Sequence, residues 1–409
     1  MKNRYNILSF KENFSWSLLS SFIFAFSQWL IISILAKFGS VEMVGLYSLG
    51  LAITAPIFLF LLMNLRVVVA TDASEARDFS NYLKFRVVTT SIAFFMVFLI
   101  TLLFNFSWEY KIIINLIALV KLVESLSDVC YGKFQQVENI RLIAISKLWR
   151  ALFSILAFFT GLLLFNSLVF ALIGQLLLWI IVLIFHDLKV IIENSDINVF
   201  KGRISKNELK SLAIVALPLG ITATLDSLNT NVPRYFISYF QDEEALGIFA
   251  GITYIMIVGQ TLVTALSQVT IPRFAKYYIN DKKNFKKLLY KLLMASTIIG
   301  FIGVIFALFL GDFILLVLYS NEFVGYSDIF ILSMIAAVFW YSSGFLNAAI
   351  MSTRKFKVQV PIFICTVIMT TFASLLLIPH LGLTGAAIAL IIGHFTRFVI
   401  AAITLKRIL

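Results

Sequence analysis

Charged residues are scarce in this 409-residue sequence: Asp, Glu, Lys and Arg make up 13% of it, whereas 61% is hydrophobic. A soluble domain carries about 25% charged residues, roughly twice this fraction, so a soluble fold is excluded. Apolar runs of about 20 residues recur along the whole chain, and each is long enough to cross a hydrocarbon core about 30 Å thick. Because backbone polar groups in lipid must be paired within their own segment, these runs must be helices. The sequence therefore predicts an all-α, polytopic membrane protein.

Cysteine and histidine are also rare. The two cysteines, Cys130 and Cys365, have neither metal-ligand spacing nor the pattern of a disulfide framework. The three histidines, His186, His380 and His394, form no H-E-x-x-H or comparable ligand pattern. The phosphate-binding pattern G-x-x-x-x-G-K-[ST] is absent, which excludes an ATP-driven transporter in one chain. We therefore predict no metal site, no cofactor and no enzymatic activity.

The apolar runs predict about twelve transmembrane helices in two six-helix lobes around a central cavity. The predicted spans are 14–36, 45–70, 87–105, 112–131, 146–166 and 168–186 in the first lobe, and 212–239, 246–271, 288–310, 327–350, 358–378 and 383–404 in the second. The longest linker begins at Asp187 and separates the lobes. The predicted domains are an N-terminal lobe (1–190), a cytoplasmic linker (191–210) and a C-terminal lobe (211–409).

Lys and Arg are distributed very unevenly between the loops of the two sides. Of the 33 basic residues, 27 fall in loops on one side, whereas Lys37 and Lys111 fall in loops on the other. Because positively charged loops stay in the cytoplasm, we predict a protein of the bacterial cytoplasmic (inner) membrane with both termini inside. The net charge of +12 follows from the same asymmetry, since basic loops face anionic lipid headgroups. A nucleic-acid partner is not expected.

A short pattern recurs at a shift of 202 residues, about half the chain. The pattern Phe38, Glu42, Gly45 and Tyr47 is repeated at the same spacing by Phe240, Glu244, Gly247 and Phe249. Six helices is an even number, so both halves of a duplicated protein would insert the same way round. Parallel repeats of this kind place a substrate site between the halves near the membrane midplane. Chance matching between apolar helices is the alternative explanation.

Four basic residues remain after those assigned to loops are counted: Arg66, Lys121, Arg234 and Arg397. An ionisable side chain at bilayer depth costs several kcal/mol unless it faces a wet or paired interior, so each is a candidate for binding substrate. Arg66 is about one turn from the cytoplasmic end of its helix, where its side chain could also extend to the interface. Basic residues, and Arg with its planar donor fork above all, suit an anionic cargo group such as a phosphate.

Carboxylates accompany these basic residues at helical spacing. Lys121, Glu124 and Asp128 share one face of the fourth predicted helix, and Asp226 and Arg234 share one face of the seventh. We interpret both groups as lining a cavity. The structural alternative is that Lys121 and Glu124, and likewise Asp226 and Arg234, simply neutralise each other. Asp128 and Asp226 are candidates for ion coupling or for holding the basic side chains in place.

Four stretches of the chain resemble the Wzx-type oligosaccharide flippases. They are Arg66 to Asp72 (RVVVATD), Ala216 to Phe236 (ALPLGITATLDSLNTNVPRYF), Glu244 to Phe249 (EALGIF) and Gln268 to Arg273 (QVTIPR). That family belongs to the multidrug/oligosaccharidyl-lipid/polysaccharide exporter superfamily, whose members have two six-helix lobes. The resemblance implies alternating-access transport of undecaprenyl-diphosphate-linked oligosaccharide repeat units, from the cytoplasmic to the outer leaflet, for O-antigen or capsule.

The resemblance also implies partners and residue roles. The expected partners are the lipid-linked oligosaccharide, membrane lipid, and the polymerase and chain-length proteins of the same pathway. Arg234 and Arg397 are expected to contact the pyrophosphate, and Lys121 and Arg66 to draw it in from the cytoplasm.

Two other functions compete with this prediction. A drug or metabolite exporter of the same superfamily carries mostly cationic cargo and should have more carboxylates than basic residues in its spans; here the basic residues are at least as frequent. A membrane enzyme, such as a polymerase or acyltransferase, needs external loops with polar clusters. The external turns predicted at 37–44, 106–111, 240–245 and 379–382 are too short for that.

Overall fold

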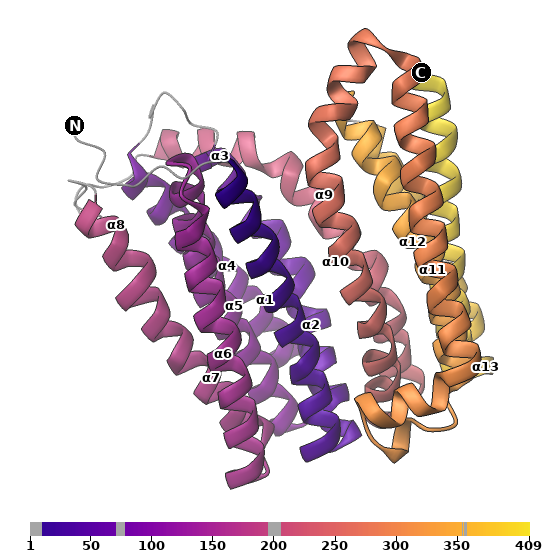
Figure 1. Ribbon diagram of the computed structural model, residues 1–409. Helices are drawn as coiled ribbons and strands as arrows, with labels where there is room; N and C mark the ends of the chain where they lie inside the picture. Colours follow the sequence, from indigo (N-terminus) through magenta and orange to yellow (C-terminus); the bar gives the residue numbers. More distant parts are fainter. Residues whose placement is uncertain (1–9, 71–77, 195–205, 354, 356–357) are drawn as a thin grey trace. The chain divides into compact units, whose positions relative to one another are not determined.

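The computed structural model describes residues 10–70, 78–194, 206–353, 355 and 358–409 (Figure 1). Within these ranges the chain forms helices and no strand, so the predicted all-α membrane fold is confirmed. Most of the predicted linker 191–210 lies outside the described residues, as does the end of the stretch from Arg66 to Asp72.

The chain folds into two compact units. Unit 1 consists of Met1–Gly39 and Gly50–Thr224, and unit 2 of Ser40–Leu49 and Leu225–Leu409. Two helices, α2 (Val41–Leu62) and α9 (Lys206–Phe240), therefore contribute residues to both units. The two units differ from the predicted lobes at two places. Residues 40–49 belong to unit 2 and not to the unit that holds the rest of the N-terminal lobe, and residues 211–224 belong to unit 1 although they were predicted in the C-terminal lobe. The division at the linker stays a prediction.

Unit 1 is a helical bundle. Besides its parts of α2 and α9, it contains α1 (Phe10–Phe38), α3 (Leu65–Ala70), α4 (Phe79–Leu103), α5 (Trp108–Gln136), α6 (Ile140–Phe165), α7 (Leu168–Val182), the π-helical turn η1 (Leu183–Leu188) and α8 (Lys189–Asn194). Helix α5 packs against α3, α4 and α7, and α6 packs against α1 and α7. The apolar core of unit 1 is formed by residues of α2, α3 and α4 together with α5 and α6.

Two helices of unit 1 differ from the predicted spans. The span predicted as 45–70 is interrupted at Met63 and Asn64, whose φ angles of 48° and 47° are left-handed and end α2 before α3 begins. The span predicted to end at residue 186 instead continues through η1 into α8. Asp187, predicted to open the linker, therefore lies inside a helix, and its side chain is fully buried.

Unit 2 is organised around a central helix, α12. It contains α10 (Glu243–Asn280), α11 (Lys282–Leu318), the short 3-10 turn η2 (Asn321–Phe323), α12 (Ser327–Ser352) and α13 (Gln359–Ile408). Helix α12 packs against α10, α11 and α13. Helix α13 is kinked at Gly382, whose φ of 55° favours glycine, at the end of the turn predicted for 379–382.

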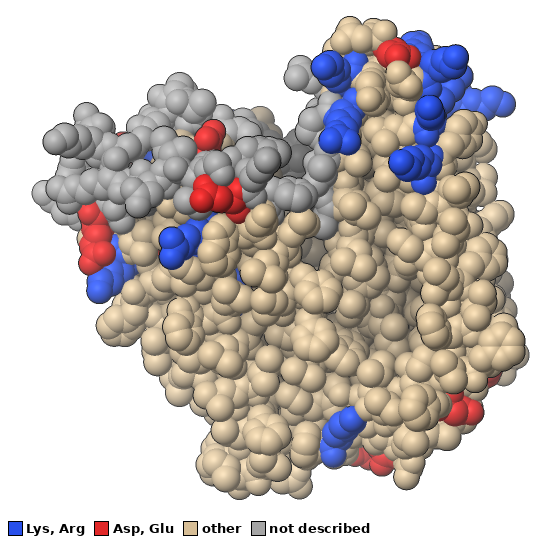
Figure 2. Space-filling model, in the orientation of Figure 1, with Lys and Arg blue, Asp and Glu red and all other residues tan. Residues whose placement is uncertain are grey.

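Two long helices of unit 2, α10 and α11, extend beyond a bilayer core. At about 1.5 Å per residue, α10 and α11 are each roughly 55 Å long, against a hydrocarbon core of about 30 Å. Figure 2 shows Lys and Arg gathered at the end of unit 2 where α11 follows α10, next to a surface with little charge. This end carries exposed basic residues of α10, α11 and α13: Arg273, Lys276, Lys282, Lys283, Lys286, Lys287, Lys291, Lys406 and Arg407.

Nine helices in the described part of the chain are long and apolar enough to cross a membrane. Two further long helices carry ionisable residues that the sequence places inside the bilayer: α5 carries Lys121, Glu124 and Asp128, and α9 carries Asp226 and Arg234. Helix α13 is counted once although it bends at Gly382. The structure is thus consistent with about twelve spans, and that number stays a prediction.

The glycines of the repeated sequence pattern contact each other's helices in unit 2. A Cβ atom on Gly45 would lie 2.0 Å from the carbonyl oxygen of Glu243, and one on Gly247 would lie 2.0 Å from that of Val41. Val41 and Glu243 are themselves 202 residues apart, like the two glycines. Each of the two glycines thus packs against a backbone carbonyl of the other helix, and that carbonyl belongs to the residue four positions before the other glycine. This reciprocal crossing of α2 and α10 supports the internal duplication.

Candidate functional site

In unit 1, two arginines face the carboxylate of Asp128 on α5. An Nη atom of Arg66 lies 3.9 Å from this carboxylate, and an Nη atom of Arg86 lies 3.7 Å from it. Arg86 is fully buried and donates a hydrogen bond of 2.9 Å to the carbonyl of Leu62. Leu62 is the last residue of α2, where the break leaves carbonyls without a helical partner, so Arg86 caps that helix end. Arg66 also donates to the side-chain oxygen of Gln135, at 3.2 Å.

A second pair lies on the same helix. The Nζ atom of Lys121 is 2.7 Å from a carboxylate oxygen of Glu124, and both side chains are partly exposed. This is the mutual neutralisation considered as the structural alternative. A role for either residue in attracting substrate stays a prediction.

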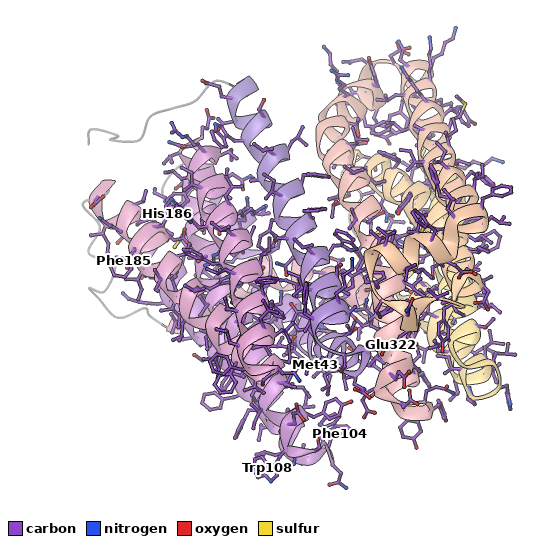
Figure 3. All side chains as sticks on the ribbon, turned by 60° about the horizontal axis from the view of Figure 1, so that its bottom comes forward. Met43, Phe104, Trp108, Phe185, His186 and Glu322 are labelled. Carbon is purple, nitrogen blue, oxygen red and sulfur yellow. The ribbon has the colours of Figure 1, made fainter. Side chains whose placement is uncertain are left out.

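A third ionic cluster in unit 1 was missed from the sequence. Arg150 and Asp187 are both fully buried, with Nη2 of Arg150 3.5 Å from Oδ2 of Asp187. The other oxygen of Asp187 lies 2.9 Å from Nδ1 of His186, which Figure 3 shows next to Phe185 on η1. The guanidinium of Arg150 lies 4.8 Å from the ring centre of Trp179. The π-helical turn thus places a buried carboxylate against a buried cation.

A signal for this cluster was available in the sequence. Arg150 falls inside the span predicted as 146–166 but was counted with the cytoplasmic loops. Arg86, likewise counted as a loop residue, directly precedes the span predicted as 87–105. Both arginines lie within long helices of the bundle. A cation beside a predicted span should therefore have been considered a buried candidate.

In unit 2, Asp226 on α9 pairs with Arg397 on α13. The Nη1 atom of Arg397 lies 2.6 Å from Oδ1 of Asp226, and the guanidinium also stacks on Phe363, 4.5 Å from its ring centre. The side-chain oxygen of Asn347, when turned toward Arg397, accepts hydrogen bonds at 2.6 and 3.1 Å. Arg397 is buried, whereas the side chain of Asp226 is 47% exposed.

The pairing of Asp226 with Arg234, considered from the sequence, is not found among the ion pairs of the described residues. The two residues are eight positions apart on one face of α9, and eight residues rise about 12 Å along a helix. That separation exceeds the reach of a direct ion pair. Arg397, from a different helix, approaches Asp226 instead.

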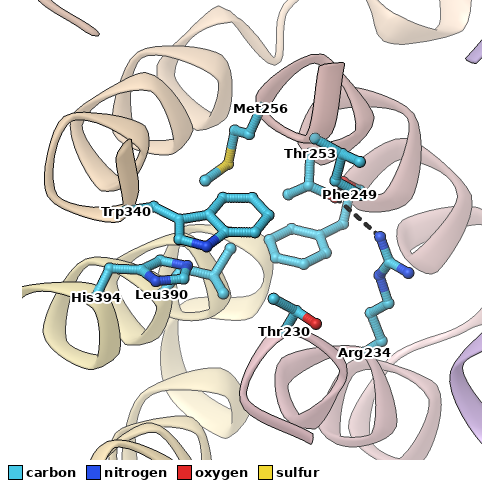
Figure 4. Close-up of a pocket in the computed structure, with 9 residues that line it drawn as sticks. Thr230, Arg234, Phe249, Thr253, Met256, Trp340, Leu390 and His394 are labelled. Atoms are coloured by element: carbon cyan, nitrogen blue, oxygen red, sulfur yellow. Dashed lines mark hydrogen bonds between the residues drawn. The ribbon is translucent and has the colours of Figure 1, made fainter. Parts of the chain in front are cut away.

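Arg234 lines a small pocket in unit 2, about 20 Å³ in this conformation (Figure 4). The lining residues come from α9, α10, α12 and α13: Thr230, Arg234, Phe249, Thr253, Met256, Ile257, Trp340, Leu390 and His394. The pocket is mostly apolar, with Arg234 as its charged group. Mostly apolar pockets with a few convergent polar groups are typical of binding sites.

The guanidinium of Arg234 is not neutralised within the described part of the chain. Its side chain is 7% exposed, and it donates two long hydrogen bonds, of 3.3 Å to Asn231 and 3.5 Å to Thr253. Its Nε has no hydrogen-bond partner, and Arg234 takes part in none of the ion pairs of the described residues. A buried charge without a counter-ion is costly. The pocket is therefore electrostatically suited to an anion.

The predicted site residues thus fall into four groups. In unit 1, Arg66 shares Asp128 with Arg86, and Lys121 pairs with Glu124. In unit 2, Asp226 pairs with Arg397, and Arg234 faces its own pocket. The structure does not bring Arg234 and Arg397 into one ion-pair cluster.

The sequence profile of a family described as polysaccharide biosynthesis protein matches residues 10–278, more than half of the chain. The chain belongs to this family. It is similar to a Staphylococcus aureus protein named capsular polysaccharide biosynthesis protein CapF, at 29% identity over 401 residues. That match covers 97% of this chain and 99% of the relative.

Solved transporters share the fold. The lipid II flippase MurJ, in an inward closed conformation, has a TM-score of 0.77 at 16% identity, covering 96% of this chain and 87% of MurJ. An inward-facing multidrug resistance MATE family transporter of the MOP superfamily has a TM-score of 0.73 at 13% identity, covering 95% of this chain and 94% of the transporter. The resemblance predicted from the sequence is confirmed, and both of these structural neighbours are transporters rather than enzymes.

Proposed function

We propose that this protein is a flippase for undecaprenyl-diphosphate-linked oligosaccharide repeat units in the bacterial cytoplasmic membrane. It moves them from the cytoplasmic to the outer leaflet by alternating access, for assembly of a capsule or another surface polysaccharide. The observation that carries the proposal is the buried, unneutralised guanidinium of Arg234 in the pocket of unit 2. A pyrophosphate is an anion that this guanidinium can bind through charge-assisted hydrogen bonds.

The family supports this cargo. The chain belongs to a polysaccharide biosynthesis family, and its relative from Staphylococcus aureus is named for capsular polysaccharide. A lipid-linked sugar has an anionic diphosphate, polar sugars and a prenyl tail that can stay in the bilayer. The two structural neighbours, MurJ and a MATE transporter, belong to a fold that carries both lipid-linked and drug-like cargo.

A drug exporter is the second candidate function, because the fold is shared with a multidrug transporter. Most such cargo is cationic and would be repelled by Arg234, which has no carboxylate neighbour among the described residues. The electrostatics of the pocket therefore favour the anionic cargo.

The proposed direction of transport requires the topology predicted from the loop charges. Single cysteines at Glu138 and Asn284 should react with a membrane-impermeant thiol reagent only after the cells are permeabilised. Cysteines at Trp108 and Asn321 should react in intact cells. All four positions are exposed, so each thiol is reachable from its own side. Labelling of Asn284 in intact cells would show that the charge asymmetry was misinterpreted.

Substitution of Arg234 tests the cargo. We expect Arg234→Gln to lower export of surface polysaccharide roughly 10- to 100-fold, the effect of losing a hydrogen-bonded charge. Lipid-linked repeat units should accumulate on the cytoplasmic face. Arg234→Lys should keep part of the activity, because the charge remains while the two-pronged donor geometry is lost. Membrane abundance, precursor accumulation and surface polysaccharide are measured in a strain without a second flippase.

Arg407→Gln is the matched control, since Arg407 is exposed near the end of α13 and does not line the Arg234 pocket. It should leave both export and abundance unchanged. If Arg234→Gln exports normally at wild-type abundance, Arg234 does not bind the cargo. If deletion of the gene leaves both surface polysaccharide and precursor levels normal, the flippase assignment itself fails.

A further inference from the structure

A second residue of the Arg234 pocket, His394 on α13, also lacks partners. Its side chain is 1% exposed, and within the described residues neither ring nitrogen has a hydrogen-bond partner. A neutral imidazole offers one donor and one acceptor. Buried polar groups are normally hydrogen-bonded to protein or water, so two bare nitrogens on one buried ring call for a specific explanation.

Trp340 holds the imidazole in place. The indole of Trp340 on α12 stacks on His394 with ring centres 5.0 Å apart and planes inclined by 16°. Figure 4 shows this pair on one side of the pocket, with Phe249 between it and Arg234. The pocket therefore has a cationic side and an aromatic side that carries a donor and an acceptor.

The chemistry of the two sides suits a ligand that has both an anionic group and hydroxyl groups. The cationic side requires an anion, and the bare ring nitrogens are satisfied together by groups that both donate and accept, such as hydroxyls. The aromatic and aliphatic wall, with Trp340, Phe249 and Met256, suits the apolar C–H face of a sugar ring. Thr230 donates to a carbonyl of its own helix, which leaves its oxygen able to accept, whereas the oxygen of Thr253 already accepts from Arg234. A sugar joined to a phosphate combines these properties.

We propose that Trp340 and His394 form the subsite for the sugar attached to the diphosphate, whose charge Arg234 neutralises. This proposal rests on the proposed function and adds residues that recognise the first sugar of the cargo. It means that the pocket of unit 2 discriminates between glycosylated and bare prenyl diphosphates. The helices α9, α10, α12 and α13 all contribute to this recognition.

Binding measurements on the purified full-length protein separate the two sides of the pocket. The probes are farnesyl diphosphate and three farnesyl-diphospho-sugars that carry glucose, galactose or N-acetylglucosamine. We expect wild type to bind at least one glycosylated probe roughly 3- to 10-fold more tightly than farnesyl diphosphate, the gain from a few neutral hydrogen bonds. His394→Leu and Trp340→Leu should lose this gain and keep the affinity for farnesyl diphosphate. Arg234→Gln should weaken binding of all four probes.

Two further variants exclude a merely structural role. His394→Gln, whose amide keeps one donor and one acceptor function, should restore most of the sugar-dependent gain. His380→Leu is the matched control, because His380 is an exposed histidine on the same helix; it should bind all probes like wild type.

Each outcome decides between the proposals. If wild type binds none of the probes, the proposed function fails and the subsite fails with it. If wild type binds farnesyl diphosphate but gains nothing from any sugar, the cargo's anion site stands and the sugar subsite is overturned. The same conclusion follows if His394→Leu keeps the full gain, since a bound water would then satisfy the imidazole.

Discussion

Asp187→Asn is expected to reduce the amount of folded protein in the membrane several-fold. The substitution keeps the shape of the side chain and removes its charge, which leaves the guanidinium of Arg150 buried without a counter-ion. Breaking a buried ion pair by removing one partner costs about 3–5 kcal/mol. A domain has about 5–15 kcal/mol of stability in total, so this loss is large. Membrane abundance and the thermal unfolding midpoint in detergent measure it.

The exposed ion pair of Lys189 and Glu193 on α8 provides the matched control. Its atoms lie 3.8 Å apart and both side chains are mostly exposed, so Glu193→Gln should change stability by less than about 1 kcal/mol. Replacing both buried partners, with Asp187→Leu and Arg150→Met, should restore abundance, because neither charge of this pair is then left without its partner. If Asp187→Asn accumulates and unfolds like wild type, the buried pair contributes little to the fold.

The membrane fold and the family could be predicted because they depend on features that the sequence states directly. The apolar runs are long enough to span a bilayer, and backbone polar groups in lipid must be hydrogen-bonded within their own segment, so these runs form helices. The stretch from Ala216 to Phe236 carries the family resemblance. The break after α2 could not be predicted. Neither Met63 nor Asn64 is a glycine or proline, and Met in particular rarely adopts the left-handed conformation observed here.

Only the charged residue of the candidate site was predicted from the sequence. Arg234 was found because a cation inside a span is conspicuous whatever surrounds it. Its neighbours Trp340 and His394 were not identified as site residues, because they lie on other helices and their position depends on how α12 and α13 pack. The alternative pairing of Asp226 with Arg234 fails for the same reason: helical spacing describes one helix, whereas Arg397 comes from another.

Gly45→Ala should disrupt the crossing of α2 and α10, and Gly247→Ala should do the same from the other side. In either variant the new methyl group would lie 2.0 Å from a backbone carbonyl oxygen, which cannot move unless its helix moves. Overpacking of this kind costs roughly 1–3 kcal/mol, and more where the neighbour is backbone. Because both substitutions act on one crossing, the double variant should be destabilised by less than the sum of the two single variants. Thermal unfolding of the purified variants measures these effects.

The position of the damage can be checked with a single thiol. Val41 is buried at the crossing, so Val41→Cys, with Cys130 and Cys365 replaced by alanine, should react slowly with an impermeant reagent. Adding Gly247→Ala should expose this thiol and speed its labelling. Gly50→Ala is the matched control, since a methyl group there meets the terminal carbon of the flexible Ile117 side chain, which can rotate away. If Gly247→Ala leaves both stability and labelling unchanged, the two helices are not held together at these glycines, and the structural support for the duplication is lost.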